Sequence, residues 1–406
     1  MGNTNLTIDW IGNEALRLAH EKASFLGTIN REFDSSFQAG YGNTIRIRIP
    51  SQYTQVAGRV IDVQDGVQQS TSITVATQHH VAMRYNSQEM SQDLVNFQRL
   101  HLEPAMAQLV SYIDGQCLSG CTISTYNTAG TAGTAITGLG QAGLARAKMN
   151  QFLAPKGERR LQIDSINMSN LVSSQASYFN PSNAISENYR EGLIARTAMA
   201  DYYENERVAT ITNATISTQP VLATYTIVEG DTDLTVSTMS GATPTTGQIF
   251  TIGTGTSGIY AVHPETKAPY NYLQQFVVTA GSTSSVINFQ PTIRISGARK
   301  NVAKSTGADI TPSTVTTAVV TFLGDQTSTY GYPLMYNRDA FTFATAALPL
   351  MDDAIRCVVK TYDGISMRVW EASDIRNDEK LTRIDILWGI AAIRPQWACR
   401  LIGTGV

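Results

Sequence analysis

The sequence predicts an α+β chain whose mixed body is interrupted by an all-β region. Apolar residues recur at helical spacing near the N-terminus and again over residues 102–117. Strict alternation at 44–50 indicates a half-buried strand. From about residue 215 to residue 325, Thr, Ser, Gly and Val dominate and helical periodicity is lost. The 406 residues suffice for two or three domains with a sizeable core.

The first predicted element is an amphipathic helix over residues 8–26. Ile8, Ile11, Ala15 and Leu18 lie on one stripe, which Trp10 widens. Two interpretations stay open, because the segment precedes any compact core. It packs on a neighbouring molecule, with Trp10 and Ile11 as candidate inter-subunit contacts, or it is an ordinary first core helix.

A long hairpin is predicted next. The strand at 44–50 and a second alternating segment, residues 71–85, flank a polar, glycine-containing stretch. Loops of this length are uncommon unless they bind something. Its charged residues Arg59, Asp62 and Asp65 are therefore candidate inter-subunit contacts.

A helical stretch is predicted over residues 91–120. Its apolar stripe consists of Leu102, Met106, Leu109, Ile113 and Cys117. Pro104 would break a helix interior, so we expect it either to open the longer helix at its first turn or to mark a kink. Gly120 is expected to end the helix.

Shorter elements follow on both sides of the all-β region. Before it we expect a loop at 122–140, a helix at 143–154, a strand at 159–163 and a loop with a short helix at 184–196. Inside it we expect strands at 248–252, 274–280, 285–289 and 314–323, and after it strands and short helices at 338–348, 366–372 and 383–395. Asp352 and Asp353 are expected at a helix start, where carboxylates favour the dipole.

One glycine pattern resembles a dinucleotide-binding turn. Gly138, Gly140 and Gly143 have the required spacing, and Asp164 follows at a suitable distance. That mechanism needs a buried strand before the first glycine, which residues 128–137 do not supply. A second match, at 253–258, lies between two predicted strands and is interpreted as a hairpin turn.

No other residues converge on a catalytic or metal site. His79 and His80 are adjacent in a predicted strand and would point to opposite faces. Cys117 and Cys121 have no second pair, and Cys357 and Cys399 are scattered, as expected for reduced thiols. We therefore expect no enzymatic activity, no cofactor and no metal.

The overall composition argues against two classes of binding partner, nucleic acids and membranes. Charged residues make up 16% of the chain and the net charge is −3, so no basic excess is available to neutralise phosphates. No apolar run is long enough for a transmembrane helix, and the N-terminus lacks a signal-peptide pattern. Synthesis in the cytoplasm, without a membrane partner, is expected.

Two segments carry a family resemblance. The run RIDILWG at 383–389, followed by Arg394 and Pro395, and the run SENYREGLIAR at 186–196 resemble coat proteins of short-tailed lambdoid Salmonella phages. Those are major capsid proteins of tailed phages with the Hong Kong 97-type fold. The order of arm helix, long hairpin, long helix and interrupted body is similar as well.

The resemblance implies a domain layout. It assigns residues 1–43 to an N-terminal arm, 44–85 to an extended hairpin called the E-loop, 86–124 to a spine helix in a peripheral domain, 125–214 and 326–375 to two parts of an axial domain, 215–325 to an inserted barrel-like β domain, and 376–406 to C-terminal peripheral and axial strands.

The implied function is assembly of hexamers and pentamers into an icosahedral shell in the virion. The shell forms in the host cytoplasm and encloses double-stranded DNA without binding it tightly. The implied partners are copies of the chain, a portal protein, a decoration protein and a separate scaffolding protein, since only a short segment precedes the hairpin. Residues 51–78 contain no lysine, so a Lys–Asn cross-link from this loop is not expected.

Two other classes of function stay open. An extracellular β-rich adhesin or fibre protein fits the Thr-, Ser- and Gly-rich region, although the helical N-terminal half and the missing signal peptide oppose it. A dinucleotide-binding enzyme rests on Gly138–Gly143 alone.

Overall fold

The structure is a computed structural model. The structure describes residues 8–33, 42–55, 58–61, 63–66, 68–86, 101–174, 200–216, 219–222, 227–237, 239, 242–310, 318–352, 354–362 and 365–403. The chain divides into two compact units. Unit 1 comprises Met1–Ile47, Ser70–Leu118 and Phe341–Ile393, and unit 2 comprises Arg48–Gln69, Ser119–Ala340 and Arg394–Val406.

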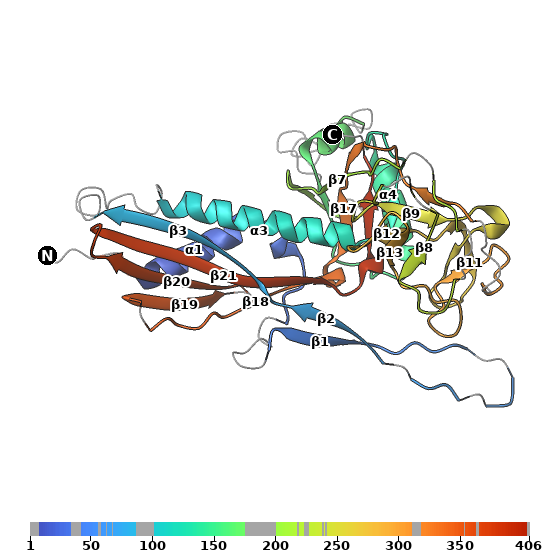
Figure 1. Cartoon of the computed structure of the whole chain (residues 1–406), viewed down its shortest axis with the longest axis horizontal. Coiled ribbons are helices and arrows are strands. Elements are labelled where there is room, and N and C mark those ends of the chain that lie inside the picture. Colours follow the sequence, from blue (N-terminus) through green and yellow to red (C-terminus); the bar gives the residue numbers. More distant parts are fainter. Residues whose placement is uncertain are drawn as a thin grey trace, which may run out of the picture. The chain divides into compact units, whose positions relative to one another are not determined.

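Unit 1 is built on an antiparallel sheet with the strand order β18-β21-β20-β19 (Figure 1). These strands are β18 (Phe341–Ala346), β19 (Arg356–Tyr362), β20 (Ile365–Asp374) and β21 (Glu379–Ala392). The long strand β21 pairs with β18 along its C-terminal half and with β3 (Thr77–Asn86) along its N-terminal half. The segments predicted at 366–372 and 383–395 are therefore central strands.

Two helices belong to unit 1, wholly or in part. Helix α1 (Ile8–Lys22) packs on β19 and β20 and buries Ile11, Ala15, Leu16 and Leu18. It is followed by a 3-10 turn, η1 (Leu26–Thr28). The second helix is α3 (Glu103–Ser124). Its buried residue Asp114 accepts hydrogen bonds from the backbone N–H groups of Phe25 and Leu26 through Oδ1, both at 2.9 Å.

The stripe predicted for the long helix is confirmed. Its five members, Leu102 through Cys117, are each at most 4% exposed, and Pro104 lies in the first turn of α3. The predicted end at Gly120 is wrong. The helix continues to Ser124, where the hydroxyls of Ser124 and Thr125 donate to the carbonyls of Gly120 and Cys121.

The second arm of the predicted hairpin is split. Strand β1 (Thr44–Ile49) pairs with β2 (Gln69–Thr74), whereas β3 begins at Thr77 and pairs with β21. Both β2 and β3 show alternating apolar and polar residues. A period of two residues indicates which face of a strand is buried, but it does not indicate with which strand it pairs.

The body of unit 2 is a five-stranded sheet in the order β4-β22-β17-β5-β6. Its strands are β4 (Thr128–Ala129), β5 (Arg159–Ile163), β6 (Asp201–Glu204), β17 (Leu334–Asn337) and β22 (Ala398–Leu401). Helix α4 (Leu139–Gln151) packs on β4, β17 and β22, and α5 (Ser165–Ser174) follows β5. The predicted strand at 159–163 is confirmed, and α4 begins four residues earlier than expected.

The region 215–325, called the β module below, contains two sheets. One has the order β15-β9-β12-β13-β8 and the other the order β11-β10-β14. The strands are β8 (Asp233–Thr235), β9 (Ile249–Ile252), β10 (Tyr260–Val262), β11 (Pro269–Leu273), β12 (Phe276–Val278), β13 (Val286–Gln290), β14 (Val302–Ala303) and β15 (Val320–Phe322). Both sheets are open over the described residues, so the expected barrel is not observed there.

The core of the β module is aromatic at its centre. Phe250 lies 5.6 Å from Phe276 and 6.0 Å from Phe289, measured between ring centroids. At the foot of the module, β7 (Thr210–Thr212) pairs with β16 (Thr329–Gly331). The glycine pattern at 253–258 contains the 3-10 turn η6 (Gly255–Ser257) and joins β9 to β10, which lie in different sheets. It is therefore a link between sheets and not the hairpin turn that we expected.

Three further predictions concern the helix start at Asp352, the segment 184–196 and the grouping of residues 326–375. Asp352 lies in a turn ahead of strand β19, so the helix expected there does not form, and Asp353 lies outside the described residues. The segment 184–196 also lies outside them. Residues 326–375, grouped above with 125–214, divide between the units at Ala340 and Phe341. Two short 3-10 turns, η7 (Arg338–Ala340) and η8 (Pro395–Trp397), complete the described elements.

Candidate functional site

The connection between β1 and β2 presents apolar side chains to solvent. Val60, Ile61 and Val63 are 86%, 85% and 78% exposed, and Tyr53 is exposed as well. Three large aliphatic side chains so close in sequence and so exposed are unusual on a protein surface and make this loop a candidate contact site. This connection, residues 50–68, is called the β1–β2 loop below (Figure 1).

The β1–β2 loop has its own cross-link in place of a strand ladder. The backbone N–H of Thr54 donates to Gln64 Oε1 at 2.8 Å, and Gln64 Nε2 donates back to the Thr54 carbonyl at 2.7 Å. A side-chain amide thus pairs with a backbone peptide across the loop. The apolar residues lie on the far side of this cross-link from the strands, where no core residue covers them.

The predicted contact residues are placed as follows. Arg59 and Asp65 are exposed on the β1–β2 loop, whereas Asp62 lies outside the described residues. Ile11 is 4% exposed and packs within unit 1, which favours the interpretation of its helix as a core helix. Trp10 belongs to α1, but its side chain lies outside the described residues.

Sequence reasoning selected the charged residues of this loop and missed its apolar ones. The available signal was the run of Val60, Ile61 and Val63 inside an otherwise polar stretch. Such a run has no period that commits it to a strand or a helix, so its exposure could be recognised only in the structure.

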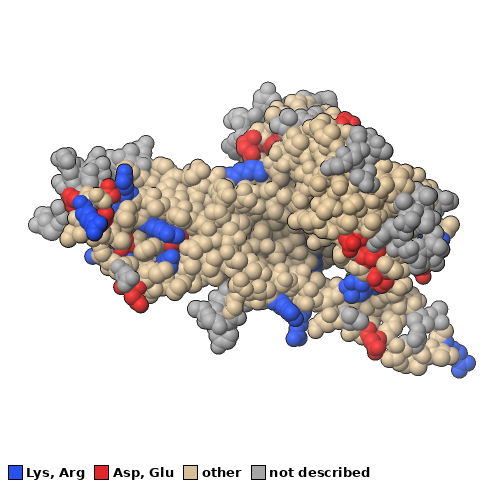
Figure 2. All heavy atoms as spheres, viewed as in Figure 1, with Lys and Arg blue, Asp and Glu red and all other residues tan. Residues whose placement is uncertain are grey.

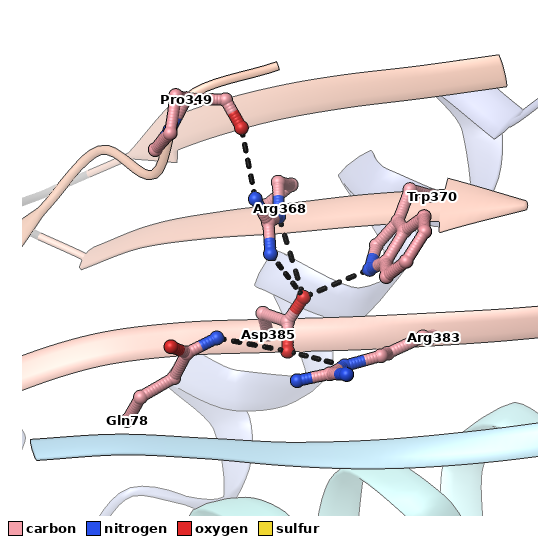
Figure 3. Close-up of polar contacts among 6 residues, drawn as sticks. All are labelled: Gln78, Pro349, Arg368, Trp370, Arg383 and Asp385. Atoms are coloured by element: carbon pink, nitrogen blue, oxygen red, sulfur yellow. Dashed lines mark hydrogen bonds and ion pairs between the residues drawn. The ribbon is translucent and has the colours of Figure 1, made fainter. Parts of the chain in front are cut away.

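A second cluster of polar residues is buried in the sheet of unit 1 (Figure 3). Arg368 on β20 is paired in register with Asp385 on β21, and Trp370 with Arg383. Residues two apart on a strand share a face, so all four side chains meet on one side of the sheet. Asp385 is fully buried and Arg368 is 3% exposed.

Asp385 accepts hydrogen bonds from four side chains. Arg368 Nη2 donates to Oδ2 at 2.8 Å and Trp370 Nε1 donates to the same oxygen at 2.9 Å. Arg383 Nε and Gln78 Nε2 donate to Oδ1 at 2.7 and 3.3 Å. Arg368 also donates through Nη1 to the carbonyl of Pro349 at 2.9 Å, which fixes the chain between β18 and β19.

The donors decide the charge of Asp385. Burial alone would raise the pKa of this carboxyl, but the hydrogen bonds from Arg368, Arg383 and Trp370 outweigh it and hold the pKa below its ordinary value. The carboxylate is therefore ionised at neutral pH and joins β3, β20 and β21. We interpret its role as structural, because both of its oxygens are occupied by donors from the same sheet.

The enzymatic pattern does not form a site. Gly138 precedes α4 in extended conformation. The two-residue buried strand β4 does form within 128–137, contrary to our expectation, but residues 130–137 form turns and irregular backbone, so no strand leads directly into the glycine turn. Asp164, the residue expected on a ribose, accepts the backbone N–H of Asn167 at 3.1 Å at the start of α5. Among the described residues no group of His, Cys, Asp and Glu side chains is arranged to hold a metal ion.

The visible surface is sparsely charged (Figure 2). On the face shown, Lys and Arg occur in small scattered groups with Asp and Glu near several of them, and most of the surface belongs to other residues. No helix in the described part of the chain has the length and apolarity that crossing a membrane requires.

Comparison with known proteins gives one family. A family model described as "P22 coat protein - gene protein 5" matches residues 62–403. No curated protein matches this chain in sequence. The match to the family model covers well over half of the chain and reaches both units.

Solved structures from several phages are similar at low identity. "Mycobacterium phage Che8" is 11% identical with a TM-score of 0.49, covering 95% of this chain and 92% of that one. "Capsid of Ralstonia phage GP4" is 9% identical with a TM-score of 0.45, covering 95% and 91%. "The head structure of Helicobacter pylori bacteriophage KHP40" is 9% identical with a TM-score of 0.41, covering 99% and 93%.

The assignment rests on the family model, which matches residues in both units. The chain therefore belongs to the P22 coat protein family and is a major capsid protein of a tailed bacteriophage.

Proposed function

We propose that copies of this chain assemble as hexamers and pentamers into the closed shell around the double-stranded DNA genome, and that the chain has no enzymatic activity. A closed shell repeats the same contacts by symmetry, so each contact can be weak while the whole is stable. The small net charge of −3 fits a protein that encloses DNA without binding it tightly.

The observation that carries the proposal is the apolar surface of the β1–β2 loop. Exposing Val60, Ile61 and Val63 to water is unfavourable, by about 25 cal/mol for each Å² of apolar surface that stays uncovered. The loop holds these residues away from the core of its own chain, so a second copy is the surface that covers them. In this proposal the loop is the E-loop of a Hong Kong 97-type fold.

Further roles follow the same layout. Residues 1–43 act as the N-terminal arm, α3 as the spine helix, and the β module as the inserted domain. A scaffolding protein, a portal protein and a decoration protein are the proposed partners, with assembly in the host cytoplasm. Arg59 and Asp65 lie beside the apolar residues and would orient the contact more than strengthen it, since exposed charges contribute little affinity.

The test replaces the apolar residues of the loop. The double variant Val60→Ser, Ile61→Ser is expected to keep the subunit's unfolding midpoint, because both side chains are already exposed, but to lose most of its assembly into fast-sedimenting particles. The matched control is Val60→Ile, Ile61→Val, which keeps the surface apolar and should assemble normally. Normal assembly of the serine variant, measured by sedimentation velocity, would rule out this loop as the contact.

A further inference from the structure

The β module is fastened to the body of unit 2 by a small cluster of polar side chains. From the body come Thr128 on β4 and Lys148 and Gln151 on α4; from the module come Tyr270, Tyr272 and Gln275. This set is called the module joint. Tyr270 donates its hydroxyl to the Gln151 carbonyl at 2.8 Å, and Tyr272 donates to Gln151 Oε1 at 2.9 Å.

Lys148 lies at the centre of the module joint. Its Nζ donates to the Thr128 carbonyl at 2.8 Å and to Gln275 Oε1. The same Gln275 oxygen accepts the backbone N–H of Thr128 at 2.8 Å. The ammonium also lies 5.0 Å from the centroid of the Tyr272 ring. One cation thus contacts both sides of the joint.

The groups around this ammonium are neutral. No carboxylate among the described residues forms an ion pair with it, and its hydrogen-bond acceptors are uncharged oxygens. The titratable groups that interact with it are Cys399 on β22 and Tyr272 on β11, and Tyr270 and Tyr126 interact in turn with Tyr272. Burial raises the pKa of each of the four, to about 12 for Cys399, so all stay neutral in mild alkali.

Arg400, a second cation that acts on Cys399, brings no negative charge to the joint. Arg400 is buried on β22 and donates to the carbonyls of Gly247 and Ile123, at 2.7 and 2.9 Å. Burial accordingly lowers the pKa of Lys148 to about 8, although Cys399 acts weakly in the opposite direction.

We infer that Lys148 makes the module joint sensitive to protons, so that the joint opens more readily when Lys148 is charged and closes more tightly when it is neutral. The sign follows from linkage. Opening the joint returns the amine to water, where it binds a proton more strongly, at its ordinary pKa of about 10.4. The closed joint therefore holds fewer protons than the open one between these values, and raising the pH favours closure. The inference concerns the single subunit and goes beyond the assembly function.

The measurement is amide hydrogen exchange of the purified full chain between pH 7 and pH 9.5. Exchange of residues 269–278 is divided by the intrinsic chemical rate at each pH, so that only the opening equilibrium remains. We expect protection to change little up to about pH 8 and then to rise by up to roughly tenfold per pH unit, the limit for one proton released on closure. Strands β20 and β21 in unit 1 serve as the internal reference.

Three variants test whether the pH dependence of protection comes from the ionisation of Lys148. Lys156→Met removes an exposed lysine of the same unit and should keep the wild-type rise. Lys148→Met and Lys148→Arg should both abolish it, because neither side chain loses a proton in this range, and the arginine variant should stay weakly protected throughout. A flat profile in the wild type, or a rise that survives in either Lys148 variant, would overturn the inference.

Discussion

Asp385 shows how a single buried carboxylate can hold a sheet together. It has no access to solvent, and the donors from β3 and β20, together with Arg383 of its own strand, compensate for the hydration that it lost. The alternation of apolar and polar residues in RIDIL predicts the strand, and Ile384 and Ile386 are buried in the structure, as that alternation implies. It does not predict that the opposite face is buried too, because that depends on strands far away in sequence.

Replacing Asp385 by Asn is expected to destabilise unit 1 by about 3 kcal/mol, because Arg368 would remain buried without its counter-charge. Chemical denaturation of the unassembled subunit measures this loss. The matched control is Asp352→Asn, an exposed aspartate in the same unit, for which a change within about 0.5 kcal/mol is expected.

The contribution of Asp385 to stability is expected to depend on pH. Because the folded pKa lies below the unfolded value of about 3.9, the contribution of Asp385 is present above that value and is lost as the pH falls through the folded pKa. The stability difference between wild type and Asp385→Asn should therefore shrink below about pH 4. A difference that stays constant down to pH 2 would show that the charge of Asp385 is not what the network depends on.

At the scale of elements, local sequence patterns predicted helices and strands correctly where only one face of the element is buried. The stripe of α3, the strand at 159–163 and the strands at 44–49 and 276–278 follow from period and propensity. The ends of elements and their partners were predicted less well. Gly120 does not end α3 because hydroxyl groups satisfy the last carbonyls, and β3 pairs with β21, which lies about 300 residues later.

Two glycines give opposite predictions for the same substitution. A Cβ added at Gly389 in β21 would lie 2.1 Å from the carbonyl oxygen of Thr74, a backbone atom that cannot move aside alone. Gly389→Ala is therefore expected to destabilise the subunit by about 2 kcal/mol or more. Gly120 lies inside α3 with no atom within 4 Å of the added Cβ, so Gly120→Ala should stabilise by about 0.5–1 kcal/mol.

Thermal unfolding of the two single variants, each unassembled, measures both effects. We expect the unfolding midpoint to fall for Gly389→Ala and to rise for Gly120→Ala, relative to the wild type. If Gly389→Ala unfolds at the wild-type midpoint, the close packing of β21 on the end of β2 is not a constraint on the fold.

At the scale of the whole molecule, the chain interleaves its two units. Residues 70–118 and 341–393 meet in unit 1 although more than 200 residues, including the β module, separate them. Composition revealed the all-β character of residues 215–325, because Thr, Ser and Gly turns interrupt short strands. It could not reveal that these strands form two open sheets, since strand order and closure depend on pairing between distant segments.

The exposed loop residues belong to this scale as well. In the proposed assembly, Val60 and Ile61 belong to a surface that another copy covers, and their exposure could be recognised only in the structure. The charged residues beside them were selected from the sequence, but these apolar residues were not. The function thus rests on an assembly, and it has to be tested on one.

The most direct test is electron microscopy of the purified full chain, produced alone and together with a scaffolding protein. We expect ring-shaped hexamers and pentamers or closed shells in at least the second preparation. A uniform population of monomers or dimers in both preparations, from subunits that unfold cooperatively and are therefore folded, would contradict the central claim that this chain builds a shell.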